Sequence, residues 1–198
     1  MGASSLLDVK RQLTFYGAYH DHPVNVAIHM IFVPTILWTA LVLSSRLPYP
    51  DFLPQYHVRF NEYLAFDLNW SGLWVIVNLI YYYILEPTAA LLYTPEWLLI
   101  GLSSAAFAYR PDAIKFAAVL HVASWLAQFS GHAFAEGRSP ALLDNLLGAL
   151  VLAPFFVHLE ILFKLGYKPQ LRDSIHQSVK QEIASIKASE AQSKKKEL

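Results

Sequence analysis

Long apolar runs, separated by short polar connections, occupy most of the chain between residues 24 and 165. The apolar runs are 24–43, 73–92, 97–109, 113–134 and 141–165. Four of them approach or exceed the roughly 20 residues that a helix needs to cross a bilayer, whereas 97–109 is short enough to be tilted or re-entrant. Pro34, Pro154 and the Glu86-Pro87 pair should kink the helices that contain them. The pattern predicts an all-α, polytopic membrane bundle of four to six hydrophobic helices.

Amphipathic segments flank this apolar region. Residues 4–19 repeat apolar side chains at helical spacing, which suits a helix that lies in the membrane interface or packs on the rest of the protein. The same spacing returns in a polar context after Lys168. We therefore expect a membrane-embedded domain over 1–168 and a soluble, amphipathic and lysine-rich tail over 169–198.

The connection at 46–70 is polar but rich in aromatic side chains. Five of these fall at helical spacing: Phe52, Tyr56, Phe60, Tyr63 and Phe66. We expect a helical stripe here, interrupted upstream by prolines. It would serve either as an aromatic belt at the membrane interface or as a lid that admits a lipid chain.

Composition supports a membrane protein and restricts its chemistry. Charged residues make up 15% of the 198 residues, against about 25% in a typical soluble domain. Net charge is zero and there is no basic face with interleaved aromatic residues, so nothing indicates nucleic acid as a partner. The absence of cysteine excludes disulfides, thiolate nucleophiles and cysteine-ligated metals.

The chain ends in Lys195-Lys196-Glu197-Leu198. Lysines three and four positions from the end resemble the dilysine retrieval signal of endoplasmic reticulum membrane proteins, which is read in the cytosol. A cytosolic, basic C-terminus also agrees with the positive-inside tendency of membrane proteins. We therefore expect the endoplasmic reticulum membrane as the location.

Imidazoles and a carboxylate lie where membrane helices are expected, and such groups are costly at membrane depth unless they serve a function. They occur in two stretches, one around the start of the first apolar run and one in the fourth. The predicted metal ligands are His20, His29, His121 and His132, and the predicted polar partners are Asn25, Gln128 and Glu136. The pattern indicates a metal site inside the membrane.

Helical geometry limits how these side chains combine. Gln128, His132 and Glu136 recur every four residues and share one helix face. His121 and His132 also share a face, but about 16 Å of helical rise separates them, too far for two imidazoles to grip one ion. Either the helix breaks at Ser130-Gly131, or two metals bind, or one histidine supports a ligand without contacting the metal.

The other four histidines have simpler explanations. His57 and His176 fall in polar segments and should lie on the surface. His158 and the nearby Glu160 can form a packed pair in the last apolar run. His22 stands at a predicted helix start, where capping explains it as well as metal ligation does.

Nitrogen-rich ligation suits iron, zinc or copper. Zinc would indicate a lipid hydrolase, whereas iron would indicate oxygen chemistry on a lipid. A non-enzymatic membrane scaffold with structural histidines is the third hypothesis. The clustered His-x-x-His-His boxes expected of membrane hydroxylases and desaturases are absent, which argues against that di-iron class.

The polar residues of the two stretches together resemble a known family. The first signature is Tyr19-His20-x4-Asn25-x3-His29, and the second is His121-x3-Trp125-x2-Gln128-Phe129-x-Gly131-His132-x3-Glu136-x3-Pro140-Ala-Leu. Their order and separation resemble the 2-hydroxy fatty acid α-dioxygenases of the endoplasmic reticulum. The resemblance extends over residues 16–167.

This resemblance implies an iron(II)-dependent enzyme of phytosphingosine breakdown, with 1–168 as its catalytic domain. It would use O2 to shorten a long-chain 2-hydroxy fatty acid by one carbon. Glu136 would accept the hydroxyl proton or orient a histidine, while Asn25 and Gln128 would bond the substrate or a ligating imidazole. Arg138 would steer the carboxylate or contact a phospholipid, and the apolar helices would enclose the acyl chain.

Overall fold

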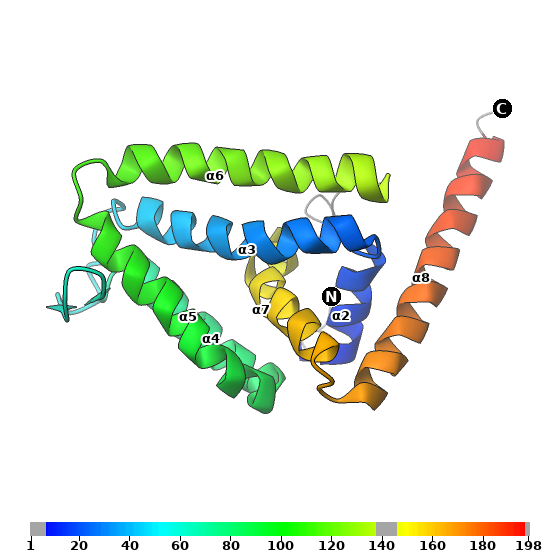
Figure 1. Ribbon diagram of the computed structural model, residues 1–198, viewed down its shortest axis with the longest axis horizontal. Coiled ribbons are helices and arrows are strands. Elements are labelled where there is room, and N and C mark those ends of the chain that lie inside the picture. The colour runs from blue at the N-terminus through cyan, green and yellow to red at the C-terminus, as the bar shows by residue number, and fades with distance from the viewer. Residues whose placement is uncertain (1–6, 138–145, 197–198) are drawn as a thin grey trace.

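The computed structural model describes residues 7–137 and 146–196, and helices make up nearly all of its regular structure (Figure 1). The helices are α2 (Val9–Ala18), α3 (Pro23–Ser44), α4 (Trp70–Leu85), α5 (Pro87–Ala108), α6 (Ala113–Ser130), the π-helical segment η1 (Gly131–Glu136), α7 (Leu146–Lys164) and α8 (Pro169–Lys196). Two short strands, β1 (His57–Arg59) and β2 (Ala65–Asp67), form an antiparallel hairpin. The predicted all-α bundle is confirmed, and the hairpin is its only strand pair within the described ranges.

Within residues 7–137 and 146–196, three helical segments are long and apolar enough to cross a bilayer: α3, α5 and the continuous α6–η1. α4 is apolar but shorter, and α7 qualifies only together with α8, across a bend of 118°. α3 and α6 lie side by side, with α4 and α5 near one end of this pair, α2 and α8 near the other, and α7 between these two groups (Figure 1). The hydrophobic helices α3 to α7 fall within the predicted four to six.

The prolines divide the apolar sequence differently from the prediction. We expected one kinked helix over 73–92 and a separate short helix over 97–109, and that division is wrong. Glu86 has an extended backbone (φ −152°, ψ 90°) because the Pro87 ring disfavours helical geometry in the residue before it. Pro87 then begins α5, where its missing N–H costs nothing. α5 continues through Pro95 without a break and is 22 residues long.

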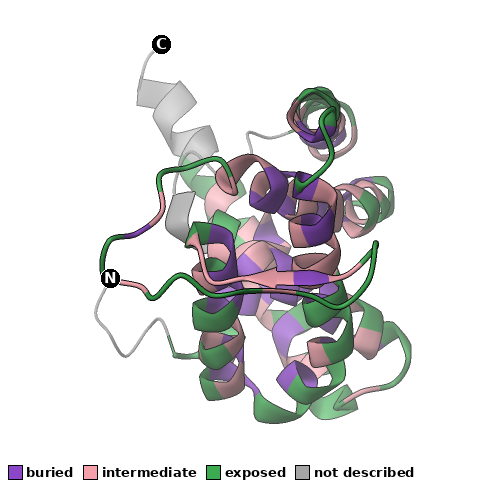
Figure 2. Cartoon of the chain, turned by 90° about the vertical axis from the view of Figure 1, so that its left-hand side faces the viewer, coloured by how far each residue is buried: buried purple, intermediate pink, exposed green. Residues whose placement is uncertain are grey.

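The predicted helical stripe of aromatic residues in 46–70 is also wrong. Aromatic residues suit strands as well as helices, and here β1 and β2 pair through their backbones. Asn61 Oδ1 closes the turn by accepting the N–H groups of Tyr63 and Leu64, at 2.8 and 2.9 Å, which is a typical asparagine turn. Figure 2 shows the hairpin from the front, lying across the ends of the helices with much of its length exposed.

A buried aromatic cluster holds α4, α5 and α7 together. The Tyr82 ring stacks on Phe155 with centroids 4.6 Å apart, and Trp97 meets Tyr82 edge to face at 5.1 Å. The Tyr82 hydroxyl donates to the Val151 carbonyl at 2.6 Å, and the Trp97 indole donates to the Val75 carbonyl at 2.9 Å. Because the polar tips of these rings are satisfied, the cluster fixes α7 firmly against the α4–α5 pair.

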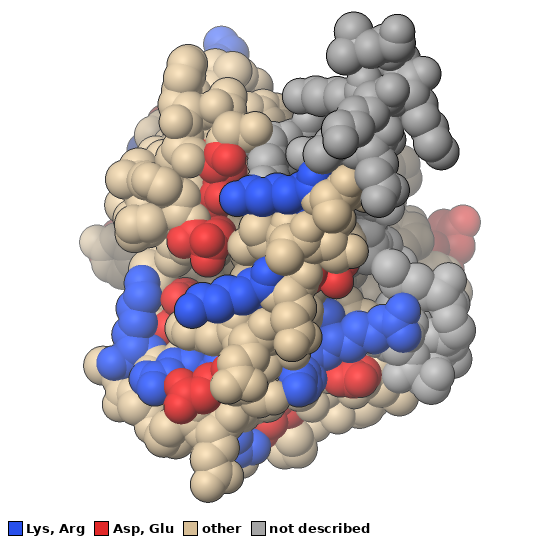
Figure 3. Space-filling model, turned by 90° about the vertical axis from the view of Figure 1, so that its right-hand side faces the viewer, with Lys and Arg blue, Asp and Glu red and all other residues tan. Residues whose placement is uncertain are grey.

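α2 and α8 pack against each other near the end of the bundle where α3 begins. Gly17 permits this close approach, since a Cβ there would lie 2.7 Å from a methyl group of Val179. Ile175 and Val179 are buried, whereas most of the described α8 side chains are exposed. Basic and acidic side chains gather on this face (Figure 3), which suits contact with water or lipid head groups.

Candidate metal centre

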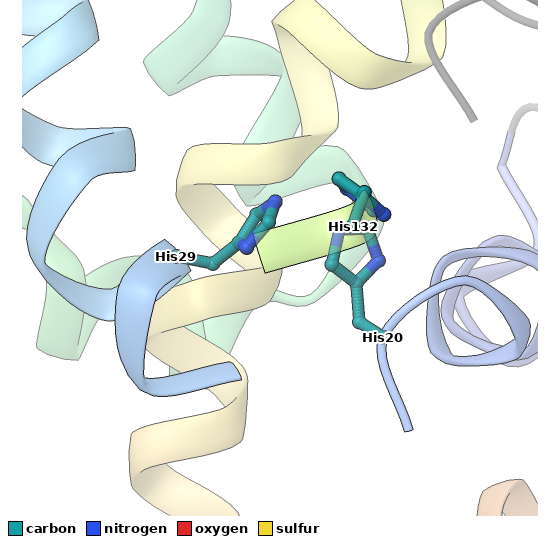
Figure 4. A group of neighbouring side chains, drawn as sticks. All are labelled: His20, His29 and His132. Atoms are coloured by element: carbon teal, nitrogen blue, oxygen red, sulfur yellow. The ribbon is translucent and has the colours of Figure 1, made fainter. Parts of the chain in front are cut away.

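Three of the four predicted ligands meet where the loop before α3, α3 itself and η1 converge (Figure 4). His20, His29 and His132 each offer one ring nitrogen, and these nitrogens all lie within 4.8 Å of one another. The ring centroids are 4.2, 4.9 and 5.0 Å apart. His29 and His132 are buried and His20 is partly buried. The fold thus brings the front of the chain together with η1, at the end of α6.

Tyr16 holds the His20 ring from two directions. His20 Nδ1 donates to the Tyr16 carbonyl at 2.8 Å, and the two rings stack with centroids 4.0 Å apart and planes 13° apart. α2 ends at Ala18, so His20 leaves the helix and folds back over its last turn. Burial first, and then the neighbouring His29, lower the pKa of His20 well below its usual value. The imidazole is therefore neutral, and the lone pair of its Nε2 can bind a metal ion.

α3 carries His29 on its buried side. Pro23 begins the helix, and His22 caps it by accepting the Val24 N–H at Nδ1, 3.2 Å away, which is one of the roles expected for it. His29 Nδ1 donates to the Asn25 carbonyl one turn earlier, at 2.9 Å. This hydrogen bond selects the Nδ1–H tautomer, as in His20, and leaves the lone pair of Nε2 to bind a metal.

His132 lies in a π-helical turn that continues α6 without a break. Such turns occur often at functional sites, because the wider turn re-aims the side chains that follow. Gly131 crosses α3 so closely that a Cβ there would lie 2.5 Å from Asn25 Oδ1. His132 Nδ1 is buried and has no hydrogen-bond partner among the described residues.

This donor set fits a transition-metal ion. Two nitrogens bound to one ion at about 2.1 Å can be at most about 4.2 Å apart, so the rings would need to approach by only about 0.6 Å. Backbone carbonyls hold two of the rings, as hydrogen-bond acceptors commonly do behind metal-bound histidines. Imidazole nitrogen suits iron, zinc and copper alike, so the geometry supports a metal site without choosing the metal.

Asn25 and Glu136 bind together the segments that carry the histidines. Glu136 Oε1 accepts the backbone N–H of His22 at 2.8 Å and an amide hydrogen of Asn25 at 3.2 Å. Asn25 is fully buried between α3 and η1, and neither residue lines the neighbouring cavity. The geometry therefore favours a positioning role for both, rather than the substrate contact or proton transfer that the sequence also allowed.

A cavity of about 460 Å³ adjoins the three histidines, and Gln128 lies in its wall. The Gln128 side chain is buried, yet neither its amide oxygen nor its amide nitrogen has a hydrogen-bond partner in the part of the chain described. A carboxamide can donate and accept at once, so it can bind a hydroxyl or a carboxylate in the cavity. Of the predicted polar partners, Gln128 is the one best placed to contact a substrate.

The fourth predicted ligand, His121, is not brought to the cluster. Its Nδ1 donates to Thr39 Oγ1 at 2.8 Å, and its Nε2 accepts the Trp125 indole N–H at 2.9 Å, so both ring nitrogens are already engaged. Thr39 lies ten residues beyond His29, which corresponds to about 15 Å along α3. We therefore leave His121 out of the ligand set. Its role is to hold the indole of Trp125, which lines the cavity, by a hydrogen bond.

Sequence reasoning gave no role of their own to two residues that the structure makes prominent. Tyr16 and Trp125 each lie four residues from a candidate histidine, one helical turn away, and that spacing was the available signal.

Arg138, the expected carboxylate contact, lies outside the described residues. For His158, whose expected partner was Glu160, the structure shows a carboxylate contact with Glu96 of α5, with Nδ1 to Oε2 at 3.6 Å.

Comparisons with known proteins cover most of the chain. A family model described as "2-hydroxy-palmitic acid dioxygenase Mpo1-like" matches residues 6–165, which include all three clustered histidines. The 2-hydroxy-palmitic acid dioxygenase MPO1 of Saccharomyces cerevisiae is 38% identical over 176 residues, covering 86% of this chain and 88% of the yeast protein. No solved structure matches the chain. Since both similarities extend over most of its length, the chain belongs to the Mpo1-like family.

Proposed function

We propose that this protein is an Fe(II)-dependent dioxygenase of long-chain 2-hydroxy fatty acids. Family membership and the name of the yeast relative support oxygen chemistry on a 2-hydroxy acid. The observation that carries the proposal is the position of three convergent imidazoles and an unpaired carboxamide beside a mainly apolar cavity. Such a cavity suits an amphiphile whose polar head reaches the metal and whose chain lies among apolar side chains.

The proposed reaction is RCH(OH)COOH + O2 → RCOOH + CO2 + H2O. The bond between C1 and C2 breaks, C1 leaves as CO2, and C2 becomes the carboxyl carbon of the shortened acid. All four electrons that reduce O2 come from the substrate, so no further reductant is needed. Iron bound at the histidines would supply redox activation of O2 and a chelation point for the carboxylate and the 2-hydroxyl group.

The chain's own residues orient and enclose the reactants. Gln128 binds the 2-hydroxyl or the carboxylate through its unpaired amide, while Asn25 and Glu136 keep α3 and η1 at a fixed separation. Among the described residues that line the cavity, the ionisable ones are Tyr16 and the three histidines. Burial first, and then the nearby Glu160, raise the pKa of Tyr16, so its phenol stays protonated. Each methylene that the apolar wall covers contributes about 0.8 kcal/mol to binding.

We further propose that the enzyme resides in the endoplasmic reticulum membrane with its C-terminus in the cytosol. The support is the pair Lys195 and Lys196, together with the charged face near α8 (Figure 3). On this view residues 1–168 are the membrane-embedded catalytic domain and 169–198 a cytosolic tail. Replacement of both lysines by serine should let the protein leave the endoplasmic reticulum, and a C-terminal epitope should be cleaved by protease added outside intact microsomes.

Metal analysis and product analysis test the activity together. Protein purified in lipid nanodiscs and loaded anaerobically with Fe(II) should consume O2 in equimolar amount with 2-hydroxypalmitate. Pentadecanoic acid and CO2 should appear in the same amount. If the iron-loaded protein shows no turnover but the zinc-loaded protein hydrolyses a lipid ester, the protein is a hydrolase and not a dioxygenase. Turnover that survives complete chelation would exclude a metal mechanism, and protein with neither metal nor turnover would support the scaffold.

A further inference from the structure

The cavity extends well beyond the metal centre along α3. Its lining includes His29 near the start of the helix, Ala40 farther along and Ser44 in the last turn. Trp70 and Trp74, from the start of α4, line it at the same end as Ser44. The cavity therefore has imidazoles and a carboxamide at one end and tryptophan side chains at the other.

The length of this cavity can be compared with that of an alkyl chain. From His29 to Ser44 are fifteen residues, which corresponds to about 22 Å of helical rise. A fully extended chain advances about 1.2 Å per covalent bond, because an extended peptide spans about 3.5 Å over three bonds. A chain that lies along α3, with its polar end at the histidines, therefore reaches the tryptophans after about 18 bonds.

The volume gives an independent estimate. A water molecule's share of liquid volume is about 30 Å³, and a methylene group is of similar size, so 460 Å³ holds about 15 such groups. One alkyl chain fits this space. Length and volume are thus both compatible with a single chain of about 15 to 18 carbons.

The tryptophan end is held in place by contacts outside the cavity. The Trp70 indole donates to the Pro48 carbonyl at 2.8 Å, and the Phe52 ring packs against Trp70 edge to face at 5.9 Å. The hydroxyl groups of Ser44 and Ser71 are 2.8 Å apart and join the end of α3 to the start of α4. These contacts set Trp70 and the start of α4 at a defined distance from the histidines, while Trp70 and Trp74 remain 40% and 36% exposed, so the wall they form is partly open.

We propose that the distance between the histidine cluster and the Trp70–Trp74 wall determines which acyl chain length the enzyme prefers. This inference rests on the proposed function only in placing the carboxylate at the histidines. A chain shorter than the cavity loses about fourfold in affinity for each missing methylene. A chain longer than the cavity must displace the tryptophan side chains or pass beside them, where additional methylenes are less well covered.

Three substitutions in the full-length protein test this idea. Ala40→Phe blocks the cavity one helical turn before Ser44, so the preferred chain should shorten by about five carbons. Trp74→Ala removes part of the far wall, so the preferred chain should lengthen. Ile31→Phe adds the same ring to the same helix at a position that is 63% exposed and outside the cavity, so its preference should stay at the wild-type length.

Two readouts separate this inference from the proposed reaction. The first is kcat/KM for O2 consumption with saturated 2-hydroxy acids of graded length. The second is displacement of a fluorescent fatty acid, in nanodiscs, by saturated acids that lack the 2-hydroxyl group and need no turnover. Opposite shifts in Ala40→Phe and Trp74→Ala support the chain-length role. If Ala40→Phe does not fold, Trp74→Ala decides alone.

The outcomes distinguish the two ideas. Length-dependent binding that shifts with the variants, without any turnover, would support the cavity's role in chain length and refute the dioxygenase. Turnover with the wild-type length profile in the folded variants would overturn the chain-length role and leave the dioxygenase standing. Failure of fatty acids of any length to displace the probe would also overturn the chain-length role.

Discussion

Replacement of Gly131 by alanine should damage the metal centre through packing alone. Gly131 lies where η1 crosses α3, directly before His132. An added Cβ would lie 2.5 Å from Asn25 Oδ1 and 3.1 Å from a methyl group of Ile28. Ordinary contact begins at 3.4 Å, so the helices must separate by about 0.9 Å unless Asn25 moves. Asn25 is fully buried, and its amide nitrogen donates to Glu136, so it has little room to move.

The size of the effect follows from this displacement. His132 is adjacent to Gly131 in the chain, and His29 stands one turn after Asn25, so separating η1 from α3 also separates two imidazoles. A misplacement of about 1 Å typically costs about 100-fold in catalysis. Overpacking of this kind costs about 1–3 kcal/mol of stability, which a bundle of this size should survive folded. We therefore expect a folded protein with weakened metal binding and kcat/KM lower by about 100-fold.

Gly101→Ala is a milder control at another helix contact. A Cβ at Gly101 would lie 3.1 Å from a methyl group of Val75, between α5 and α4, so it introduces less crowding than the 2.5 Å contact at Gly131. Iron content, kcat/KM and thermal unfolding would be measured for both variants in nanodiscs. Gly131→Ala with wild-type iron content and turnover would show that the η1–α3 crossing does not set the site geometry.

Further substitutions separate ligands from supporting residues and probe one ion pair. His29→Ala should lose stoichiometric metal and turnover while it keeps the circular dichroism of the wild type; retained metal would remove His29 from the ligand set. His121→Phe should keep the metal but leave the Trp125 indole unpaired, at a cost of about 1–3 kcal/mol in unfolding free energy; loss of metal would restore His121 as a ligand. Lys168 donates to the buried Glu86 carboxylate at 2.9 Å, which raises the Lys168 pKa. Its stabilising contribution is therefore complete below the ordinary lysine pKa of 10.5 and lost as pH rises through the folded value. Lys168→Met should cost about 1–2 kcal/mol near neutral pH, since the lysine is partly exposed, and should flatten the alkaline decline in melting temperature; an unchanged decline would assign it to other groups.

The sequence predicted best where a single chain segment contains the whole signal. α3 was expected over 24–43 and runs from Pro23 to Ser44, because its apolar length and its initial proline are both local properties. His20, His29 and His132 were expected to converge from distant segments, and the structure brings them together. Their binding of a metal remains a prediction. The physical basis was the cost of burying imidazole in an apolar environment without a use for it.

The sequence was less informative where a residue's partners could not be read from its own segment. His121 has the same residue type and setting as the other candidates, but Thr39 of α3 and the indole of Trp125 occupy its nitrogens. The aromatic residues before α4 satisfied a helical period by coincidence, while the Asn61 turn and backbone pairing decided for a hairpin. The burial of the Glu86 carboxylate could not be recognised, because its partner Lys168 lies 82 residues away.

Unsatisfied polar atoms concentrate at the proposed site, and that distribution predicts how ligands affect stability. Five buried side-chain polar atoms lack partners among the described residues, and three of them belong to Gln128 and His132 beside the cavity. Each such atom costs about 1–3 kcal/mol, so these three lower the stability of the protein without ligand by about 3–9 kcal/mol. Metal at a free concentration 100 times its Kd would return about 2.7 kcal/mol. Chelation should therefore lower the melting temperature, and a saturated 2-hydroxy acid added anaerobically should raise it less in Gln128→Leu than in the wild type. Equal melting temperatures with and without metal would mean that no ion is held by these imidazoles.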